Sequence, residues 1–408
     1  MASEWRESTW GEEISLEYGK GLRGYADAEG PVRVFGTNGP VGWTTEPLAP
    51  GPGIIVGRKG AYRGVHYSPN PFFVIDTAYY VAPKSDLDMR WLYYAIIHHK
   101  LGEINDGSPI PSTTRAAVYV RELQVPHLEE QCAIAEILGS LDDKIELNRR
   151  MNGTLESLAR AIFKAWFIDF LPVKAKAAGA TSFPGIPQNL FDQLPNKLTN
   201  SELGLIPEGW EAVPLSKLVV LLGGGTPKRK IAEYWDGDIP WFSVRDAPAD
   251  NDMWIIDTEE YITEKGVKNS SAKVMRKGTT IVSARGTVGR LALTAIPMAM
   301  NQSCYGIQGE RGVGDFFVHF TLRHAVTELR QRTHGSVFDT ITRKTFDVLD
   351  RVRPQSEMIV AFEEAVALYL LLMRNNLFEN RTLAAIRDAL LPKLILGEVR
   401  VGACDGER

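Results

Sequence analysis

Apolar residues recur every three or four positions over nearly forty residues, from Pro126 to about Leu171. A spacing of 3.5 residues sustained over this length is typical of a long helix whose apolar seam is covered by another helix. The predicted seam consists of Ile134, Leu138, Leu141, Ile145, Asn148, Asn152, Leu155, Ala159, Ile162 and Trp166. Its two asparagines are unusual, because a buried asparagine costs stability but fixes the register of a helix pair.

A second stretch repeats this pattern without a gap at an offset of 228 residues. Its seam consists of Phe362, Val366, Tyr369, Met373, Asn376, Asn380, Leu383, Arg387, Leu390 and Leu394. Both asparagines recur, and Pro126 has its counterpart in Pro354. Two unrelated buried helices would not explain polar residues that match in one register. The pattern therefore indicates an internal duplication whose two long helices pair with each other.

Composition limits the class of protein. A chain of 408 residues predicts two or three domains, and no segment approaches the eighteen consecutive apolar residues of a membrane span. Glu4, Arg6 and Glu7 interrupt the N-terminal segment where a signal peptide needs an apolar core, so a soluble, cytoplasmic protein is expected. Three scattered cysteines exclude a thiolate zinc site of usual spacing, and no metal is expected. A net charge of -4 argues against a generic polycation, so nucleic-acid binding would need local basic patches or a partner.

Two glycine-rich basic turns provide such patches. Arg58, Lys59 and Arg63 lie among glycines in a stretch without acidic residues, and a similar turn with Arg285 and Thr287 follows at an offset of 226 to 227 residues. Glycines let backbone amides and guanidinium groups approach phosphates or base edges closely. A single turn of this kind is often only a solvated loop, but its recurrence favours a function.

Other polar residues recur with these turns. Gly107-Ser108 and Thr114-Arg115 return as Gly335-Ser336 and Thr342-Arg343 at the offset of 228. Trp10 and Trp210 suggest an offset closer to 200 near the start, so the second copy is expected to contain about thirty extra residues.

The second copy carries further basic residues. From Lys265 to Gly309 there are seven lysines and arginines and no acid, which suits contacts to phosphates and base edges. The glycine-rich run from Gly223 to Lys230 does not fit a nucleotide P-loop. Trp241 and Phe242 are expected in the core rather than against bases. The predicted DNA contacts are Arg58, Lys59, Arg63, Ser108, Arg115, Thr226, Lys228, Arg229, Ser243, Arg245, Arg285, Thr287 and Arg343.

In their order along the chain, these motifs resemble a known family. Leu-Gly-Leu-Ile-Pro-Glu-Gly-Trp at 203–210 is followed by Gly-Gly-Gly-Thr-Pro-Lys, Ile-Pro-Trp-Phe-Ser, Ser-Ala-Arg-Gly-Thr-Val-Gly and a long helix. The chain is similar to the DNA-specificity subunit of Type I restriction-modification enzymes. The likeness covers nearly the whole length, and the second half matches better than the first.

The resemblance implies an α+β fold with two mixed α/β target-recognition domains, separated by an antiparallel pair of long coiled-coil helices. Each domain would read one half of an asymmetric, bipartite DNA site, and the helices would set the spacing. The expected boundaries are 1–125 and 207–353 for the recognition domains, 126–171 and 354–400 for the helices, 172–206 for a proline-rich connector and 401–408 for a tail.

It also implies partners that perform the chemistry. Two modification subunits would bring S-adenosylmethionine and methylate adenine, and restriction subunits would use ATP and Mg²⁺ to cut DNA. This chain would hold no cofactor and would not be an enzyme. Asn70-Pro-Phe-Phe73 is its only approach to an adenine-methyltransferase motif and lacks the second proline. A coiled-coil scaffold without base-specific readout remains the alternative function.

Apolar residues beyond the seam predict a second interface on the helices. The residues expected to bind the partner subunits are Phe163, Phe167, Phe170 and Leu391. The alternative is that these side chains pack against the recognition domains. The two interpretations differ in whether the side chains are exposed.

Overall fold

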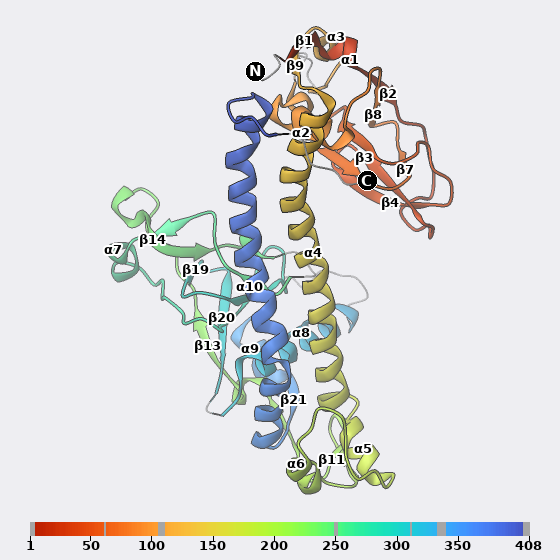
Figure 1. Cartoon of the computed structure of the whole chain (residues 1–408). Coiled ribbons are helices and arrows are strands. Elements are labelled where there is room, and N and C mark those ends of the chain that lie inside the picture. The colour runs from red at the N-terminus through yellow and green to blue at the C-terminus, as the bar shows by residue number, and fades with distance from the viewer. Residues whose placement is uncertain are drawn as a thin grey trace. The chain divides into compact units, whose positions relative to one another are not determined.

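The computed structural model describes residues 5–60, 63–104, 111–248, 252–310, 312–332 and 340–402. They form two compact units, unit 1 (Met1–Ile145 and Arg381–Arg408) and unit 2 (Glu146–Asn380). Helices α4 (Leu128–Phe167) and α10 (Ser356–Ile395) have 40 residues each, and each contributes one part to each unit (Figure 1, yellow and blue). None of the described helices is long and apolar enough to cross a membrane.

The described residues of unit 1 form two sheets and a short strand pair. The sheet orders are β2-β8-β5-β6, which is antiparallel, and β4-β3-β7, in which β3 and β7 run parallel. The strands are β1 (Arg6–Thr9), β2 (Ile14–Tyr18), β3 (Val32–Gly36), β4 (Gly39–Thr44), β5 (Gly53–Gly57), β6 (Val65–Ser68), β7 (Phe72–Val74), β8 (Ala78–Pro83) and β9 (Glu122–Val125). The helices are α1 (Trp10–Glu13), α2 (Met89–His98), η1 (Leu101–Glu103) and α3 (Arg115–Tyr119). Trp10 and Trp91 lie fully buried in the core.

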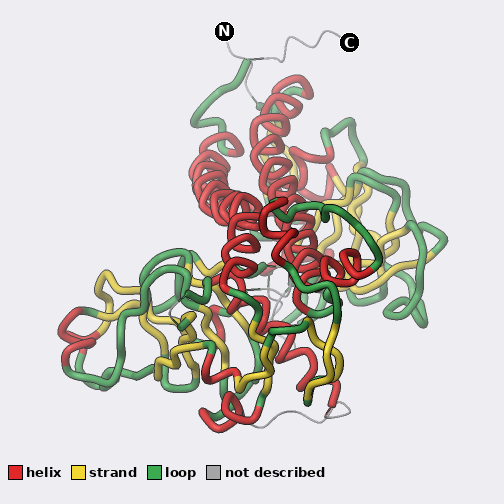
Figure 2. Tube along the Cα trace, turned by 90° about the horizontal axis from the view of Figure 1, so that it is seen from below, coloured by secondary structure: helices red, strands yellow, loops and turns green. Residues whose placement is uncertain are grey.

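Unit 2 repeats this topology. Its sheets have the orders β13-β20-β17-β18-β15 and β16-β14-β19, and β14 is parallel to β19 as β3 is to β7. Figure 2 draws the strands in yellow. The strands are β12 (Glu211–Pro214), β13 (Val219–Gly223), β14 (Trp235–Phe242), β15 (Trp254–Ile255), β16 (Tyr261–Ile262), β17 (Thr280–Ser283), β18 (Leu291–Thr294), β19 (Ala299–Met300), β20 (Cys304–Gly309) and β21 (Asp350–Arg353). The helices are η2 (Leu215–Lys217), η3 (Ala232–Tyr234), η4 (Val244–Asp246), α7 (Glu264–Lys268), α8 (Asp315–Arg332) and α9 (Arg343–Val348).

The first strand pair of each unit fixes the offset of the duplication. Arg6 pairs with Val125 in the β1–β9 ladder, and Glu211 pairs with Arg353 in the β12–β21 ladder. The offset is therefore 205 at the start and 228 at the end, and the second copy has 23 extra residues rather than about thirty. Trp210 corresponds to Trp5 and not to Trp10, because the strand register, rather than the residue type, defines the equivalence.

The two long helices run antiparallel, as their asparagine contacts in unit 2 show. Asn148 Nδ2 donates to Asn380 Oδ1 at 2.9 Å, and Asn376 Nδ2 donates to Asn152 Oδ1 at 2.8 Å. Since Asn376 is the repeat of Asn148 and Asn380 the repeat of Asn152, the two contacts are related by a local two-fold axis. Each of these amides, of which those of Asn148, Asn152 and Asn376 are buried, therefore finds its partner in the repeated copy.

The remaining seam residues are buried to different degrees. Ile145 and Met373 are buried, whereas Leu141, Leu155 and Leu383 are partly exposed. Tyr369 is also partly exposed, and Leu370 is the fully buried residue at this turn of α10. The assignment of Tyr369 to the seam is therefore corrected to Leu370. A straight helix repeats every 3.6 residues, and the buried residues of α10 follow a 4,4,3 spacing here (Phe362, Val366, Leu370 and Met373) in place of the strict 4,3 alternation.

The connector is folded, in contrast to the sequence-based expectation. Residues after α4 form α5 (Leu171–Ala177), α6 (Gln188–Gln193) and the hairpin of β10 (Leu198–Ser201) with β11 (Gly204–Pro207). Pro172 lies in the first turn of α5 and Pro187 is the N-cap of α6. Proline is tolerated at helix starts, because the amide it lacks has no intrahelical partner there.

Candidate nucleic-acid interface

The turn between β17 and β18 presents Arg285 to solvent. Ser283 closes the turn, because its backbone N–H donates to Arg290 O at 2.9 Å and its hydroxyl donates to Thr287 O at 2.5 Å. Gly286 and Gly289 have φ angles of +76° and +79°, a region that favours glycine. Arg285 is exposed and forms no ion pair with the described residues. The turn therefore holds an available guanidinium group on a rigid base.

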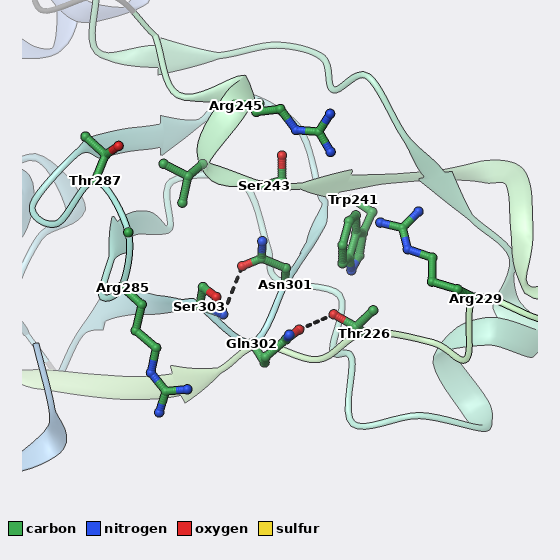
Figure 3. A pocket seen from close by; sticks show the side chains of 12 residues that line it. Thr226, Arg229, Trp241, Ser243, Arg245, Arg285, Thr287, Asn301, Gln302 and Ser303 are labelled. Carbon is green, nitrogen blue, oxygen red and sulfur yellow. Dashed lines mark hydrogen bonds between the residues drawn. The ribbon is translucent and has the colours of Figure 1, made fainter. Parts of the chain in front are cut away.

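A hollow of about 700 Å³ in unit 2 brings most of the predicted residues of this unit together. Six of them line it, from the loop after β13, the end of β14 and the β17–β18 turn: Thr226, Arg229, Ser243, Arg245, Arg285 and Thr287. The other lining residues are Trp241, Val244, Gly286, Asn301, Gln302 and Ser303. Figure 3 shows three separate guanidinium groups around a centre of amide and hydroxyl groups. The hollow thus combines cations with neutral donors and acceptors.

Arg229 is held by an aromatic pair and a carboxylate. Its Cζ atom lies 3.8 Å from the Trp235 ring centroid and 5.1 Å from that of Trp241, and its Nη2 donates to Glu260 Oε2 at 2.9 Å. The hydrogen bond from Arg229 lowers the pKa of Glu260. Trp241 is buried, as expected, and its indole N–H donates to Gly225 O at 2.9 Å. Arg229 is thus fixed in orientation but is already paired.

Three polar residues of the hollow were not identified from the sequence. Asn301, Gln302 and Ser303 form the loop between β19 and β20. Gln302 Oε1 accepts a hydrogen bond from the Thr226 hydroxyl, and Asn301 Oδ1 accepts from Ser303 N at 3.0 Å (Figure 3). A Cβ atom on Gly224 would lie 1.9 Å from Asn301 O, so only glycine permits this approach. The signal in the sequence was a run of three polar residues inside the acid-free window, which is the segment from Lys265 to Gly309 without Asp or Glu.

Ser243 and Arg245 lie at the same end of β14. The Ser243 amide and hydroxyl both donate to Asp246 Oδ2, at 2.7 and 2.9 Å, which caps the short helix η4. Arg245 lies 3.9 Å from Glu259, and both side chains are largely exposed. An exposed pair of this kind is weak, so Arg245 can exchange this carboxylate for another anion.

The acid-free window is compensated by acids from other segments. Arg276 Nη2 donates to Asp315 Oδ1 at 2.7 Å, Lys268 lies 3.3 Å from Glu264, and Lys265 pairs with Glu233. The interpretation of the whole window as a basic surface is therefore corrected. A linear count of charges does not include acids that the fold brings next to the window.

Lys228 and Arg343 are both exposed and are not among the residues that line the hollow. Arg343 begins α9. The preceding segment joins the Arg285 turn, because Ile341 N donates to Ala284 O at 3.0 Å. Arg343 therefore lies two residues after a residue that is hydrogen-bonded to the Arg285 turn.

The turn after β5 in unit 1 is the structural counterpart of the Arg285 turn. Gly57 N donates to Gly64 O at 2.8 Å, as Ser283 does to Arg290, and Thr113 N donates to Arg58 O at 2.9 Å, as Ile341 does to Ala284. At this offset of 226, Lys59 occupies the position of Arg285, and both are exposed. Both turns therefore place a cation at the same point of the repeated fold.

Arg58 and Arg115 come together in unit 1. Their Cζ atoms lie 5.0 and 4.3 Å from the ring centroid of Tyr18, at the end of β2. Arg115 is also 3.6 Å from Glu17, and Arg58 Nη1 donates to Asp76 O at 3.2 Å. The two arginines thus share one aromatic surface.

Arg63 has a structural role that the sequence did not indicate. Its guanidinium donates to three backbone carbonyls, those of Gly60 at 2.7 Å, Gly102 at 2.8 Å and Ile104 at 3.0 Å. We therefore correct its assignment as a DNA contact: its donors hold the turn to the following loop. Ser108, another predicted contact, lies outside the described residues.

Phe163, Phe167 and Phe170 belong to the core of unit 2. All three are buried, and Phe163 stacks on Phe320 with ring centroids 5.8 Å apart. Their assignment as partner-binding residues is therefore wrong, because α8 and the loop before β12 cover them. Leu391 is partly buried and packs against the core of unit 1.

Comparison with known proteins identifies the family. The model of one family, the Type I restriction modification DNA specificity domain, matches residues 30–157 and again residues 207–350. The chain is 29% identical to the Type I restriction enzyme HindI specificity subunit of Haemophilus influenzae, over 71% of each chain. It is 26% identical to the MjaIX specificity subunit of Methanocaldococcus jannaschii, over 85% of this chain and 78% of that one.

The fold has a counterpart among solved structures. The S subunit of a Type I restriction-modification system from M. genitalium matches 96% of both chains with a TM-score of 0.61 and 16% sequence identity, a likeness that shows the fold alone. The predicted fold class, with its duplicated recognition domains and long helices, is confirmed. The repeated domain, the two equivalent cationic turns and the two family matches agree: this chain belongs to the Type I restriction modification DNA specificity domain family.

Proposed function

We propose that the Lys59 turn and the Arg285 turn each contact one half of an asymmetric, bipartite DNA target. The observation that carries this proposal is their equivalence, since the same backbone contacts hold an exposed cation at the same position in both units. The two recognition domains of a specificity subunit read different sequences, so the same backbone turn has to present a different side chain to DNA in each domain. A scaffold without readout would not need these turns.

The hollow beside Arg285 has the chemistry of base readout. Arginine pairs bidentately with the O6 and N7 atoms of guanine, and asparagine or glutamine pairs with N6 and N7 of adenine. Arg285 supplies the first kind of group, and Asn301 and Gln302 supply the second. Arg245 lies at the exposed edge, where phosphate contact suits a long, weakly paired cation.

The chain is a non-catalytic specificity subunit, and its partners perform the reaction. Two modification subunits carry S-adenosylmethionine and methylate adenine, and restriction subunits use ATP and Mg²⁺ to cleave unmethylated DNA. This chain then contributes only recognition and holds no cofactor. The complex acts on DNA in the cytoplasm, where these cofactors are available.

The length of the helices sets the number of unread base pairs in this proposal. Each helix has 40 residues, which corresponds to about 60 Å at ~1.5 Å per residue. Inserting seven residues into both helices at matched positions preserves the seam and adds about 10 Å. We expect the spacer to lengthen by up to about three base pairs while both half-site sequences stay unchanged. A folded, active variant that methylates the original spacer would contradict this.

Replacement of the two cations tests the proposed readout. Arg285→Ala in the complex with modification subunits should weaken DNA binding by ~1 to 3 kcal/mol and relax one base pair of the methylated motif. Lys59→Ala should change only the other half-site. Lys273→Ala is the matched control, because Lys273 is an exposed cation of the same window outside the hollow. Wild-type affinity and motif in both Arg285→Ala and Lys59→Ala would reject the proposal.

A further inference from the structure

Unit 1 holds two guanidinium groups over one exposed ring. Tyr18 is 49% exposed, and the Cζ atoms of Arg58 and Arg115 lie 5.0 and 4.3 Å from its ring centroid. Arg58 follows β5 and Arg115 begins α3, so the fold brings the two together from distant segments. Stacking on a ring restricts the arginine side chains before any ligand arrives, which reduces the entropy lost on binding.

The charges of this cluster are only partly balanced. Glu17 lies 3.6 Å from Arg115, whereas Arg58 donates to a neutral acceptor, the Asp76 carbonyl, at 3.2 Å. Burial raises the pKa of Tyr79, below the cluster, to about 12, so this phenol adds no negative charge. The Nε atom of Arg115 is buried without a hydrogen-bond partner within the described part of the chain. Two neighbouring cations with one carboxylate leave a site suited to a further anion.

We propose that Arg58 and Arg115, ordered by Tyr18, bind a backbone phosphate of the DNA next to the half-site contacted by unit 1. This inference rests on the proposed function. A phosphate accepts hydrogen bonds from two arginine forks and carries the charge that the cluster lacks. Arg58 is the neighbour of Lys59, so the cluster extends the footprint of the turn: Lys59 faces bases and the cluster fixes the position on the backbone.

Unit 2 does not repeat this cluster of two arginines and a tyrosine. At the offsets of the duplicated strands, Gly223 replaces Tyr18 and Ala284 replaces Arg58, and only Arg343 remains as the counterpart of Arg115. The phosphate contact is therefore a property of unit 1 and not of the repeated fold. Its loss should affect binding without changing the sequence read by either unit.

The salt dependence of DNA binding tests this assignment. In the complex with modification subunits, the slope of log K against log salt should become smaller in Arg58→Ala and in Arg115→Ala, by up to ~0.9 when both are replaced, because the two arginines share one phosphate. The methylated motif should stay unchanged. Arg121→Ala, which removes an exposed cation of unit 1 outside the cluster, should keep the wild-type slope.

Two further variants separate charge from structure. Tyr18→Phe keeps the ring and should bind as wild type, whereas Tyr18→Ala should weaken binding at an unchanged motif. Arg58→Lys keeps the positive charge but not the planar guanidinium group, so it should retain the wild-type salt slope. It provides a test if Arg58→Ala does not fold. An unchanged slope in both folded alanine variants, or a relaxed base pair in the motif, would overturn the phosphate assignment. Neither result decides the test of Lys59 and Arg285, which uses the affinity and the methylated motif of the Lys59→Ala and Arg285→Ala variants.

Discussion

The two units attach their recognition domain to the long helices in different ways. In unit 1 the apolar cluster that contains Leu138 of α4 and Leu394 of α10 is accompanied by polar contacts. Arg90 Nη2 donates to Asp143 Oδ1 at 2.7 Å and to Gly139 O at 2.9 Å, and Tyr94 Oη donates to Asp142 Oδ2 at 2.7 Å. Arg387 of α10 donates to the same Asp142 at 2.6 Å. One carboxylate of α4 thus joins α2 and α10.

In unit 2 the corresponding contact is aromatic. Phe163 and Phe167 of α4 meet Phe317 of α8 at centroid distances of 5.8 and 5.0 Å, and Phe362 of α10 lies 5.4 Å from Phe167. Polar contacts are present as well: Glu363 Oε1 accepts from Phe317 N at 2.8 Å at the start of α8, and Trp254 Nε1 donates to Leu370 O of α10 at 2.9 Å. A duplicated framework can therefore keep its topology while the contacts that accompany the buried apolar cluster differ between the two copies.

The largest expected effect is at the aromatic contact. Phe362 is fully buried, so Phe362→Ala should cost about 3 to 5 kcal/mol of unfolding free energy, with little dependence on salt. Denaturant unfolding measures this. Leu368→Ala on the same helix is the control, because Leu368 is 73% exposed and its loss should cost under ~0.5 kcal/mol. Equal effects of both changes would contradict the burial argument.

A smaller effect is expected at Glu363. Burial raises the pKa of its carboxyl from 4.5 to about 7, so the folded state binds a proton that the unfolded state releases between these values. The folded state should therefore lose up to ~3 kcal/mol of stability as pH rises from about 4.5 to 7, and nothing more above 7. Glu363→Gln removes this loss. Unfolding curves at pH 5 and pH 8 should show a smaller change in the variant, and equal changes would reject the effect.

The smallest effect is expected at the polar contact. Arg387 and Asp142 are about three-quarters buried, and Tyr94 still bonds Asp142 when the arginine is removed. Arg387→Ala should cost about 1 kcal/mol, and the cost should shrink in high salt. Asp388→Ala, which removes the exposed second partner, should cost less. A loss that is independent of salt would show that Arg387 acts through packing of its aliphatic part.

Much of this architecture could be predicted because the duplication repeats information. The recurring asparagines located the helix pair, and the recurring turns located Arg285. The direction in which a side chain points, and the element that covers it, could not be predicted from the sequence. Arg58 and Arg63 have the same side chain in one turn, yet one lies over Tyr18 and the other bonds three carbonyls. Likewise, the spacing of Phe163 and Phe167 showed a second apolar face but not that α8 covers it.

The asparagine pairing makes each long helix self-complementary. Asn148 meets the repeat of Asn152, and Asn152 meets the repeat of Asn148, so either helix alone carries both sides of the contact. The asparagines alone would therefore pair equally well in two ways: α4 with α10 of the same chain, or α4 with α4 of another molecule. What favours the internal partner is tethering, since two helices in one chain meet at a high effective concentration. Covalent linkage, together with contacts that need two different helices, such as Arg387 with Asp142, keeps the two different recognition domains together as one asymmetric reader.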